Sequence, residues 1–204
     1  MSTKYKIRDQ HGLNFITCTI SGWADLFTRA EFRNIVLDSW RYCSQHKGLQ
    51  IWGYVIMPNH LHMIANAAPP FRLEDTIRDF KAHTARKFLE VLQDFSKQES
   101  RREWLLPLFQ DSARKRRSKQ TFQLWEPSNH PIELYTEPVV IQKLQYLHDN
   151  PVRANFVKRP QDWIYSSASN YATGHGIYDV HLLWTDFEAD GGWFFGNTDF
   201  PLMG

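Results

Sequence analysis

Apolar residues recur along the chain with two spacings, one typical of strands and one typical of helices. The predicted strands, rich in β-branched and aromatic residues, are 12–20, 49–57, 61–67 and 121–135. The predicted helices, with apolar residues three and four apart, are 28–46, 73–95 and 137–149. Turn residues mark the boundaries: Lys47-Gly48 ends the first helix, Pro58-Asn59 joins two strands as a hairpin, and Asn150-Pro151 ends the last helix.

The order of these elements is strand, helix, strand, strand, helix, strand, helix. It predicts an α+β fold in which a ferredoxin-like, split βαβ antiparallel sheet has its helices on one side. The length of 204 residues fits one domain over 1–159 with an irregular basic insertion at about 98–120. A C-terminal extension, 160–204, is expected to pack on the same domain.

Composition narrows the class of protein. A hydrophobic content of 42%, with 15% aromatic residues, is enough to build a buried core. No apolar run approaches the roughly 18 residues of a membrane span, and the first residues have no apolar signal-peptide centre. We therefore expect a cytoplasmic protein without a membrane partner, in which Cys18 and Cys43 are reduced, partly buried thiols.

The charge is unevenly distributed along the chain. Residues 160–204 contain six acidic residues and no lysine or arginine, so they carry −6 and residues 1–159 carry +8. A basic body favours a polyanionic partner. The densest basic run is Arg114 to Lys119, which on its own is equally well explained as a solvated charged loop.

Two histidines stand in an otherwise apolar strand, directly after the Pro58-Asn59 turn. Side chains two apart in a strand point to one face, so His60 and His62 project together and Leu61 points to the core. Their Cα atoms are about 7 Å apart, which suits two ligands of one metal ion. Taken alone, such a pair is more often structural than metal-binding.

The last predicted helix adds two polar groups. Val140, Leu144 and Leu147 form its buried stripe, and Tyr146 and Asn150 lie beside that stripe as an i,i+4 pair. A hydroxyl and an amide oxygen presented together could complete a site with the histidines, Tyr146 as nucleophile and Asn150 as third metal ligand. Each residue also has an ordinary structural explanation, as an aromatic at the core edge and as a helix end before proline.

At these positions the sequence resembles a known family. "YVIMPNHLH", followed later by "YLHDNPVRANFV", resembles the single-tyrosine HUH (IS200-like) transposases, and especially the bacterial REP-associated tyrosine transposases. The resemblance extends to "GWADLFTRAEF", "WEPSNHPIEL" and "DWIYSSASNY", and so covers roughly residues 4–183. Asp149 and Asn155 depart from the residues that are frequent in the family, and His130 matches a frequent position to which we assign no role.

The resemblance implies an activity and a site. Such enzymes cleave and join single-stranded DNA near hairpins, and their tyrosine, here Tyr146, forms a 5′-phosphotyrosine and frees a 3′-hydroxyl. The metal ligands implied are His60, His62 and Asn150. Their donor set suits Mg²⁺ or Mn²⁺, and also Zn²⁺ or Ni²⁺ in a preparation. No ATP is needed, because the phosphotyrosine keeps the energy of the phosphodiester.

The expected DNA ligands are cations in three regions: the amino-terminal arm, the second helix and the basic run. They are Lys4, Lys6, Arg8, Arg78, Lys81, Arg114, Lys115, Arg116 and Arg117. Two alternatives stay open: a hairpin-binding regulator without catalysis, and an HUH relaxase or replication initiator. The sequence leaves the recognised hairpin and the choice between monomer and homodimer undetermined.

The segment from Trp184 onward is acidic and rich in aromatic residues. Such a composition can imitate the phosphates and bases of single-stranded DNA, and one hypothesis is that this segment lies over the DNA-binding groove and partly occupies it. The alternative is an aromatic clasp that caps the sheet or joins two copies.

Overall fold

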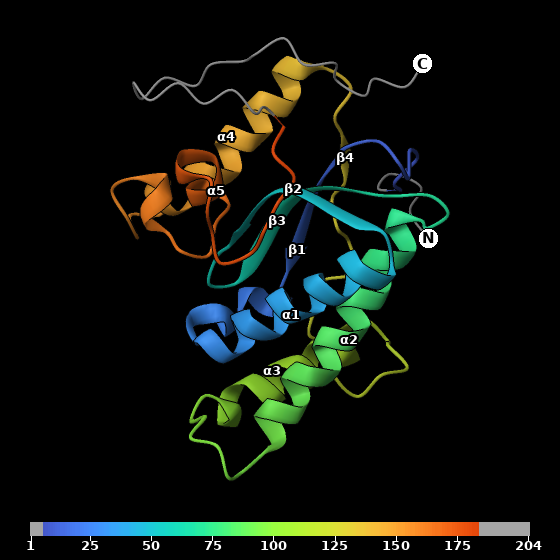
Figure 1. Ribbon diagram of the computed structural model, residues 1–204. Helices are drawn as coiled ribbons and strands as arrows, with labels where there is room; N and C mark the ends of the chain where they lie inside the picture. The colour runs from blue at the N-terminus through green and yellow to red at the C-terminus, as the bar shows by residue number, and fades with distance from the viewer. Residues whose placement is uncertain (1–5, 184–204) are drawn as a thin grey trace.

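The computed structural model describes residues 6–183, which form a four-stranded antiparallel sheet between two helical layers (Figure 1). The strands are β1 (Asn14–Thr19), β2 (Leu49–Ile56), β3 (His60–Ala67) and β4 (Ile132–Glu133), in the spatial order β2-β3-β1-β4. The α-helices are α1 (Ala30–His46), α2 (Leu73–Gln93), α3 (Arg102–Lys115), α4 (Glu137–Arg153) and α5 (Ala168–Thr173). The 3-10 turns are η2 (Ser21–Trp23), η3 (Leu26–Thr28) and η4 (Pro160–Asp162). The predicted α+β, ferredoxin-like split βαβ sheet is confirmed.

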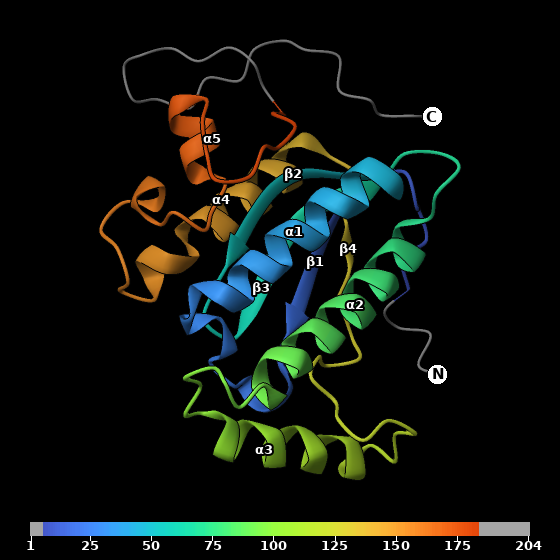
Figure 2. The same ribbon diagram turned by 60° about the horizontal axis from the view of Figure 1, so that its bottom comes forward.

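Helices α1 and α2 cover one face of the sheet, as Figure 2 shows. Alternate residues of the strands point to this layer, among them Ile16 of β1 and Leu61 of β3, both fully buried. Trp40 of α1 stacks on Phe80 of α2 with ring centroids 6.1 Å apart. The apolar residues that recur at helical spacing on α1 and α2 thus pack against each other and against the sheet in one core.

Helix α4 covers the opposite face, so the expectation of helices on one side only is wrong. The other set of alternate strand residues, including Phe15 and Ile64, packs against Val140, Leu144 and Leu147 of α4. Both faces of these strands are apolar, which requires a helical layer on each. Gly53 of β2 lets α4 come close, because a Cβ there would meet Leu144 Cδ1 at 2.7 Å.

Helix α3 replaces the irregular segment expected around residues 98–120. Leu105, Phe109 and Ala113, four residues apart, form its buried stripe. The prediction missed this helix because of the dense charge around the stripe and because of Pro107. Pro107 lies in the second turn, where its missing N–H costs a single hydrogen bond.

The fourth strand is shorter than predicted. Only Ile132–Glu133 is regular, although Trp125 also bridges Ile20 and the Thr17 N–H donates to the Asn129 carbonyl at 2.9 Å. Pro127 and Pro131 have no N–H for a ladder, and His130 has a left-handed φ of 41°. The segment 125–133 therefore runs along the edge of β1, but it pairs with that strand at separate points and not as one continuous ladder.

Helix α4 runs past its predicted end at residue 149 to Arg153. Pro151 is buried within the last turn, and the Ala154 N–H donates to the Asn150 carbonyl at 3.0 Å. A proline this near the C-terminus removes a bond without ending the helix. Tyr146 and Asn150 thus belong to one continuous helix.

The described part of the C-terminal extension, residues 160–183, packs on the domain. Trp163, Leu182 and Leu183 lie against the core beside α4, and the Ser167 N–H donates to the Tyr54 carbonyl of β2 at 2.9 Å. The hypothesis that the segment from Trp184 onward lies over a DNA-binding groove concerns residues outside the described ones.

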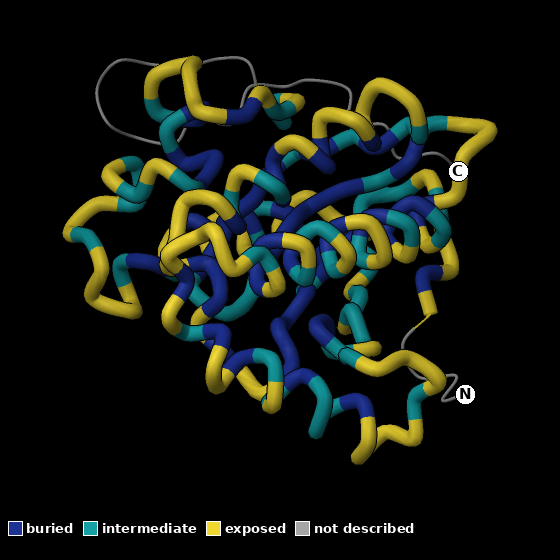
Figure 3. Tube along the Cα trace, turned by 90° about the horizontal axis from the view of Figure 1, so that it is seen from below, coloured by how far each residue is buried: buried dark blue, intermediate teal, exposed yellow. Residues whose placement is uncertain are grey.

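Buried residues follow the strands through the middle of the molecule, and exposed residues lie on the outer turns (Figure 3). Cys18 and Cys43 are free, buried thiols, as predicted. Within residues 6–183, every helix is too short or too polar to traverse a lipid bilayer.

Candidate active site

His60 and His62 lie together on the α4 face of β3, at the end of the strand next to the β2–β3 turn. Their ring centroids are 4.8 Å apart. His62 pairs with Thr17 across the sheet, and His60 pairs with Thr19. The predicted projection of both imidazoles to one face, with Leu61 in the opposite core, is confirmed.

Each imidazole is held through Nδ1. Thr17 Oγ1 lies 2.8 Å from His62 Nδ1, and Asn59 Oδ1 lies 2.7 Å from His60 Nδ1. The Asn59 amide is itself oriented, since its Nδ2 donates to Asp25 Oδ1 at 2.9 Å. An amide oxygen only accepts, so His60 carries its proton on Nδ1, and its Nε2 lone pair remains for a metal ion.

Burial keeps both imidazoles neutral. It lowers the pKa of His60 to about 4, and it lowers the pKa of His62 to about 3, with smaller contributions from the charges of His60 and Lys143. A metal ion binds the neutral form of imidazole. At neutral pH these two histidines are already neutral, so metal binding does not require them to release a proton.

Tyr146 of α4 lies over the same patch. Its ring contacts His62 edge-on with centroids 5.6 Å apart, and Phe15 of β1 packs against both, at 5.0 Å from His62 and 6.0 Å from Tyr146. The Tyr146 side chain is 39% exposed, on the flank of α4 as predicted. The structure thus joins the histidine pair and the helix tyrosine from distant parts of the chain.

Two cations flank the tyrosine. Lys143 Nζ lies 5.7 Å and the Arg153 guanidinium carbon 5.3 Å from the centroid of the Tyr146 ring. Together with Asn150 they form a stripe along α4 at steps of three and four residues: Lys143, Tyr146, Asn150, Arg153. An anionic group approaching Tyr146 would meet positive charge on both sides.

The residues present fit a divalent metal ion. Within residues 6–183 no group of three side chains of the types His, Cys, Asp and Glu is placed to hold a metal ion. Asn150, half-buried and one turn beyond Tyr146, offers an amide oxygen.

The family model for IS200-like transposases matches residues 16–120. The chain belongs to the IS200-like transposase family. The match begins within β1, continues past the end of α3 and includes both histidines, but it ends before Tyr146. A search of curated proteins finds no match.

One solved structure supports the fold, and a second is a weaker match. A REP-associated tyrosine transposase bound to a REP hairpin aligns with a TM-score of 0.56 and 18% identity, over 93% of this chain and 96% of that one. A putative transposase from Deinococcus radiodurans R1 aligns with a TM-score of 0.41 and 17% identity, over 73% of this chain and 97% of that one. The first likeness covers 93% of this chain, so the shared fold reaches beyond the residues that the family model matches.

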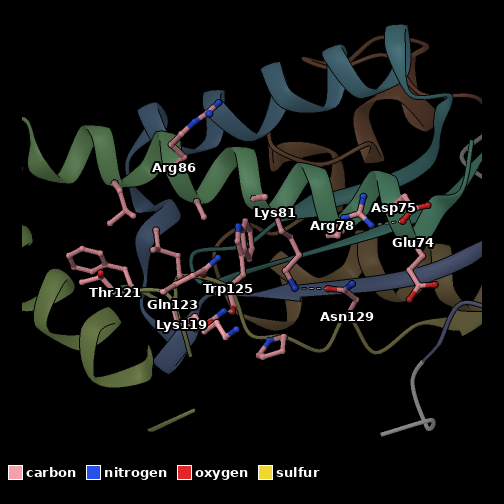
Figure 4. A pocket seen from close by; sticks show the side chains of 17 residues that line it. Glu74, Asp75, Arg78, Lys81, Arg86, Lys119, Thr121, Gln123, Trp125 and Asn129 are labelled. Atoms are coloured by element: carbon pink, nitrogen blue, oxygen red, sulfur yellow. Dashed lines mark hydrogen bonds and ion pairs between the residues drawn. The ribbon is translucent and has the colours of Figure 1, made fainter. Parts of the chain in front are cut away.

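A groove of about 840 Å³ lies on the other side of the sheet, between α2 and the segment 119–129 (Figure 4). Arg78, Lys81, Arg86 and Lys119 contribute cations to it, and neither histidine nor Tyr146 is among its lining residues. Lys81 Nζ donates to Asn129 Oδ1 and to the Glu126 carbonyl, at 2.7 and 2.6 Å. The Lys81 ammonium therefore anchors this segment to α2.

The remaining predicted DNA ligands differ in their surroundings. Lys6 and Arg8 are exposed around the buried Ile7, the alternation expected of the arm, and Lys4 lies outside the described residues. Arg78 pairs with Asp75 and Asp79, Lys115 with Asp111, and Arg116 with Glu126. Arg114 and Arg117 are exposed at the C-terminal end of α3. Among the described residues, no hydrogen bond, ion pair or ring contact joins these cations to His60 or His62.

Several residues of the site were missed by the sequence analysis. Lys143 and Arg153 had a signal, since they share the helical stripe of Tyr146. No local pattern in the sequence marks Phe15, Thr17 or Asp25 as part of the site. They reach the histidines through the register of β1 on β3 and through the η2–η3 turns. His130, to which the sequence assigned no role, is exposed beside the edge of β1.

Proposed function

We propose that this chain is a metal-dependent enzyme that nicks and joins single-stranded DNA beside hairpins, with Tyr146 as the nucleophile. The observation that carries the proposal is the packing of the Tyr146 ring against His62, next to His60, between the cations Lys143 and Arg153. Hairpin DNA is proposed because the related fold of the REP-associated transposase binds a REP hairpin.

In the proposed reaction the Tyr146 hydroxyl oxygen attacks the phosphorus of a phosphodiester. The bond from phosphorus to the 3′-oxygen breaks, the phenol loses its proton, and the departing oxygen gains one. The products are a 5′-phosphotyrosine and a 3′-hydroxyl. Attack by a 3′-hydroxyl reverses the step and joins strands without ATP.

His60, His62 and Asn150 would hold the metal ion, Mg²⁺ or Mn²⁺. A bound divalent ion polarises a phosphate oxygen and neutralises charge on the departing oxygen. Thr17 and Asn59 orient the imidazoles, and Lys143 and Arg153 bind the phosphate electrostatically beside the nucleophile. Exposed cations, including Lys6, Arg8, Arg114 and Arg117, are proposed to contact the DNA backbone.

The test is incubation of the protein with a pool of single-stranded genomic hairpins and Mn²⁺, followed by trapping of covalent protein–DNA adducts. Wild type is expected to form an adduct and Tyr146→Phe to form none while still binding DNA. Tyr135→Phe is the matched control, since Tyr135 is an exposed tyrosine that precedes α4. An adduct in Tyr146→Phe would remove Tyr146 from the mechanism.

A further inference from the structure

Trp23 stands exposed at the edge of the candidate active site. Its side chain is 66% exposed, and its ring meets that of His60 edge-on with centroids 6.1 Å apart. Single exposed aromatic side chains are common on protein surfaces, and what sets Trp23 apart is its place beside His60. Trp23 thus lies next to His60, one of the proposed metal ligands.

The backbone holds the indole there at a cost. Trp23 has a φ of 55°, a left-handed conformation that side chains with a Cβ disfavour, and Gly22 before it has a φ of 68°. Strain of this kind is kept where the surrounding structure imposes it, and it gathers at functional sites.

Neighbouring elements impose this conformation. The Trp23 N–H donates to the Ile20 carbonyl at 3.0 Å, and the Ser21 N–H donates to the Leu124 carbonyl at 2.7 Å. A Cβ on Gly22 would meet Leu108 of α3 at 3.0 Å, so the turn is seated against that helix. Helix α3 and the 121–125 segment therefore fix the turn from which the indole projects.

We propose that Trp23 is a stacking platform for an unpaired base of the DNA strand, the base of the nucleotide adjoining the phosphate that the site cleaves. This inference rests on the proposed function and adds a base-binding subsite to it. Every base offers a π-face to an aromatic ring, so a single exposed indole is sufficient to hold one. The 6.1 Å between the Trp23 and His60 rings puts this platform within one nucleotide of a phosphate held at the histidines.

The local charge favours a base over a phosphate at this position. Asp25, two residues after Trp23, is exposed, and its carboxylate is held by the Asn59 amide. A carboxylate repels a phosphate but not an uncharged base. The proposed orientation puts the base on Trp23 and the phosphate beside Lys143, whose ammonium lies 5.7 Å from the centre of the Tyr146 ring.

The experiment uses full-length protein with the Tyr146→Phe substitution and no added metal, so that binding is measured without cleavage. The probe is a thymidine homopolymer carrying 5-bromouracil, which crosslinks to stacked aromatic side chains on irradiation. We expect a crosslink in the peptide that contains Trp23. Trp23→Ala should weaken binding of the homopolymer by at least about 5-fold, and Trp23→Phe by less, because phenylalanine keeps a ring.

Two features guard against a folding artefact. Alanine has a Cβ, as tryptophan does, so Trp23→Ala leaves the strain of the left-handed φ in place, and its thermal melting is expected to match wild type. The matched control is Tyr42→Ala, which removes a 55% exposed aromatic from the end of α1 that leads to Leu49. Leu49 pairs with Ala67, at the opposite end of β3 from His60.

The outcomes separate the inference from the function on which it rests. Equal affinity of wild type and Trp23→Ala, or crosslinks that miss the Trp23 peptide, would overturn the stacking platform and leave tyrosine chemistry standing. Absence of adducts and of DNA binding in wild type would overturn both.

Discussion

At the scale of single residues, the candidate site depends on side chains that orient the histidines. Thr17 is hydrogen-bonded to Nδ1 of His62, and Asn59 is hydrogen-bonded to Nδ1 of His60. Asn59 is in turn held by Asp25. Such partners set which ring nitrogen is protonated and how the ring is turned. The metal affinity of the pair should therefore depend on residues that do not touch the metal ion.

Thr17→Val tests this dependence. Valine keeps the shape of threonine and removes the hydroxyl, so His62 loses the group that holds its Nδ1. We expect Mn²⁺ affinity, measured by calorimetry on the DNA-free protein, to fall about 10-fold. Thr19→Val is the control, since Thr19 lies on the same face of β1 and, within residues 6–183, its hydroxyl has no hydrogen bond to either histidine. Equal affinities of the two variants would show that Thr17 does not orient His62.

At the scale of elements, the close approach of α4 to the sheet brings nucleophile and histidines together. Gly53 of β2 has no side chain where Leu144 of α4 packs, and a bulge at Ile51 and Gly53 interrupts the pairing of β2 with β3. Tyr146, two residues after Leu144, meets His62 only if α4 keeps this distance. One glycine on a strand thus affects a contact made by a helix.

Gly53→Ala is expected to lower both thermal stability and the rate of adduct formation. The added Cβ would lie 2.7 Å from Leu144 Cδ1, which forces the leucine or the helix to move. Overpacking of this kind costs about 1–3 kcal/mol. In a double-mutant cycle with Leu144→Ala the two changes should be non-additive, because alanine removes the clashing atom. Additive effects would mean that the clash with Leu144 is not the cause.

At the scale of the whole molecule, buried neutral histidines link stability to pH. His148 of α4 is buried, its Nε2 lies 2.8 Å from Ser167 Oγ, and burial lowers its pKa from 6.5 to about 3. At a pH between these two pKa values, His148 is protonated in the unfolded chain and neutral in the folded chain. The contribution of His148 to stability is therefore complete above pH 6.5 and is lost as the pH falls from 6.5 toward 3.

We expect the free energy of unfolding in urea to fall on acidification below pH 6.5, by on the order of 1 kcal/mol per pH unit for His148. His148→Gln, which keeps a polar partner for Ser167 and does not titrate, should show a shallower slope in the same window. Parallel slopes for the two proteins would show that His148 is not responsible.

The sequence by itself determined the elements and the two motifs. Apolar spacing predicted β1, α1, β2, β3, α2 and α4, because helix and strand periods are local properties of the chain. The same local geometry put His60 with His62, and Tyr146 with Asn150, on shared faces. Helix α3 was not predicted, because its apolar stripe consists only of Leu105, Phe109 and Ala113. Many charged residues and Pro107 surround that stripe in the sequence.

Tertiary structure alone decided how the two motifs meet and what surrounds them. Thr17 and His62 are 45 residues apart in sequence, and only the register of β1 on β3 brings them together. Tyr146 reaches His62 because α4 packs on the second face of the sheet, a layer that a one-sided pattern of helices did not predict. Trp23 lies beside His60 because a strained turn is seated on α3. Contacts of this kind come from packing between distant segments, which the spacing of residues along a single segment does not encode.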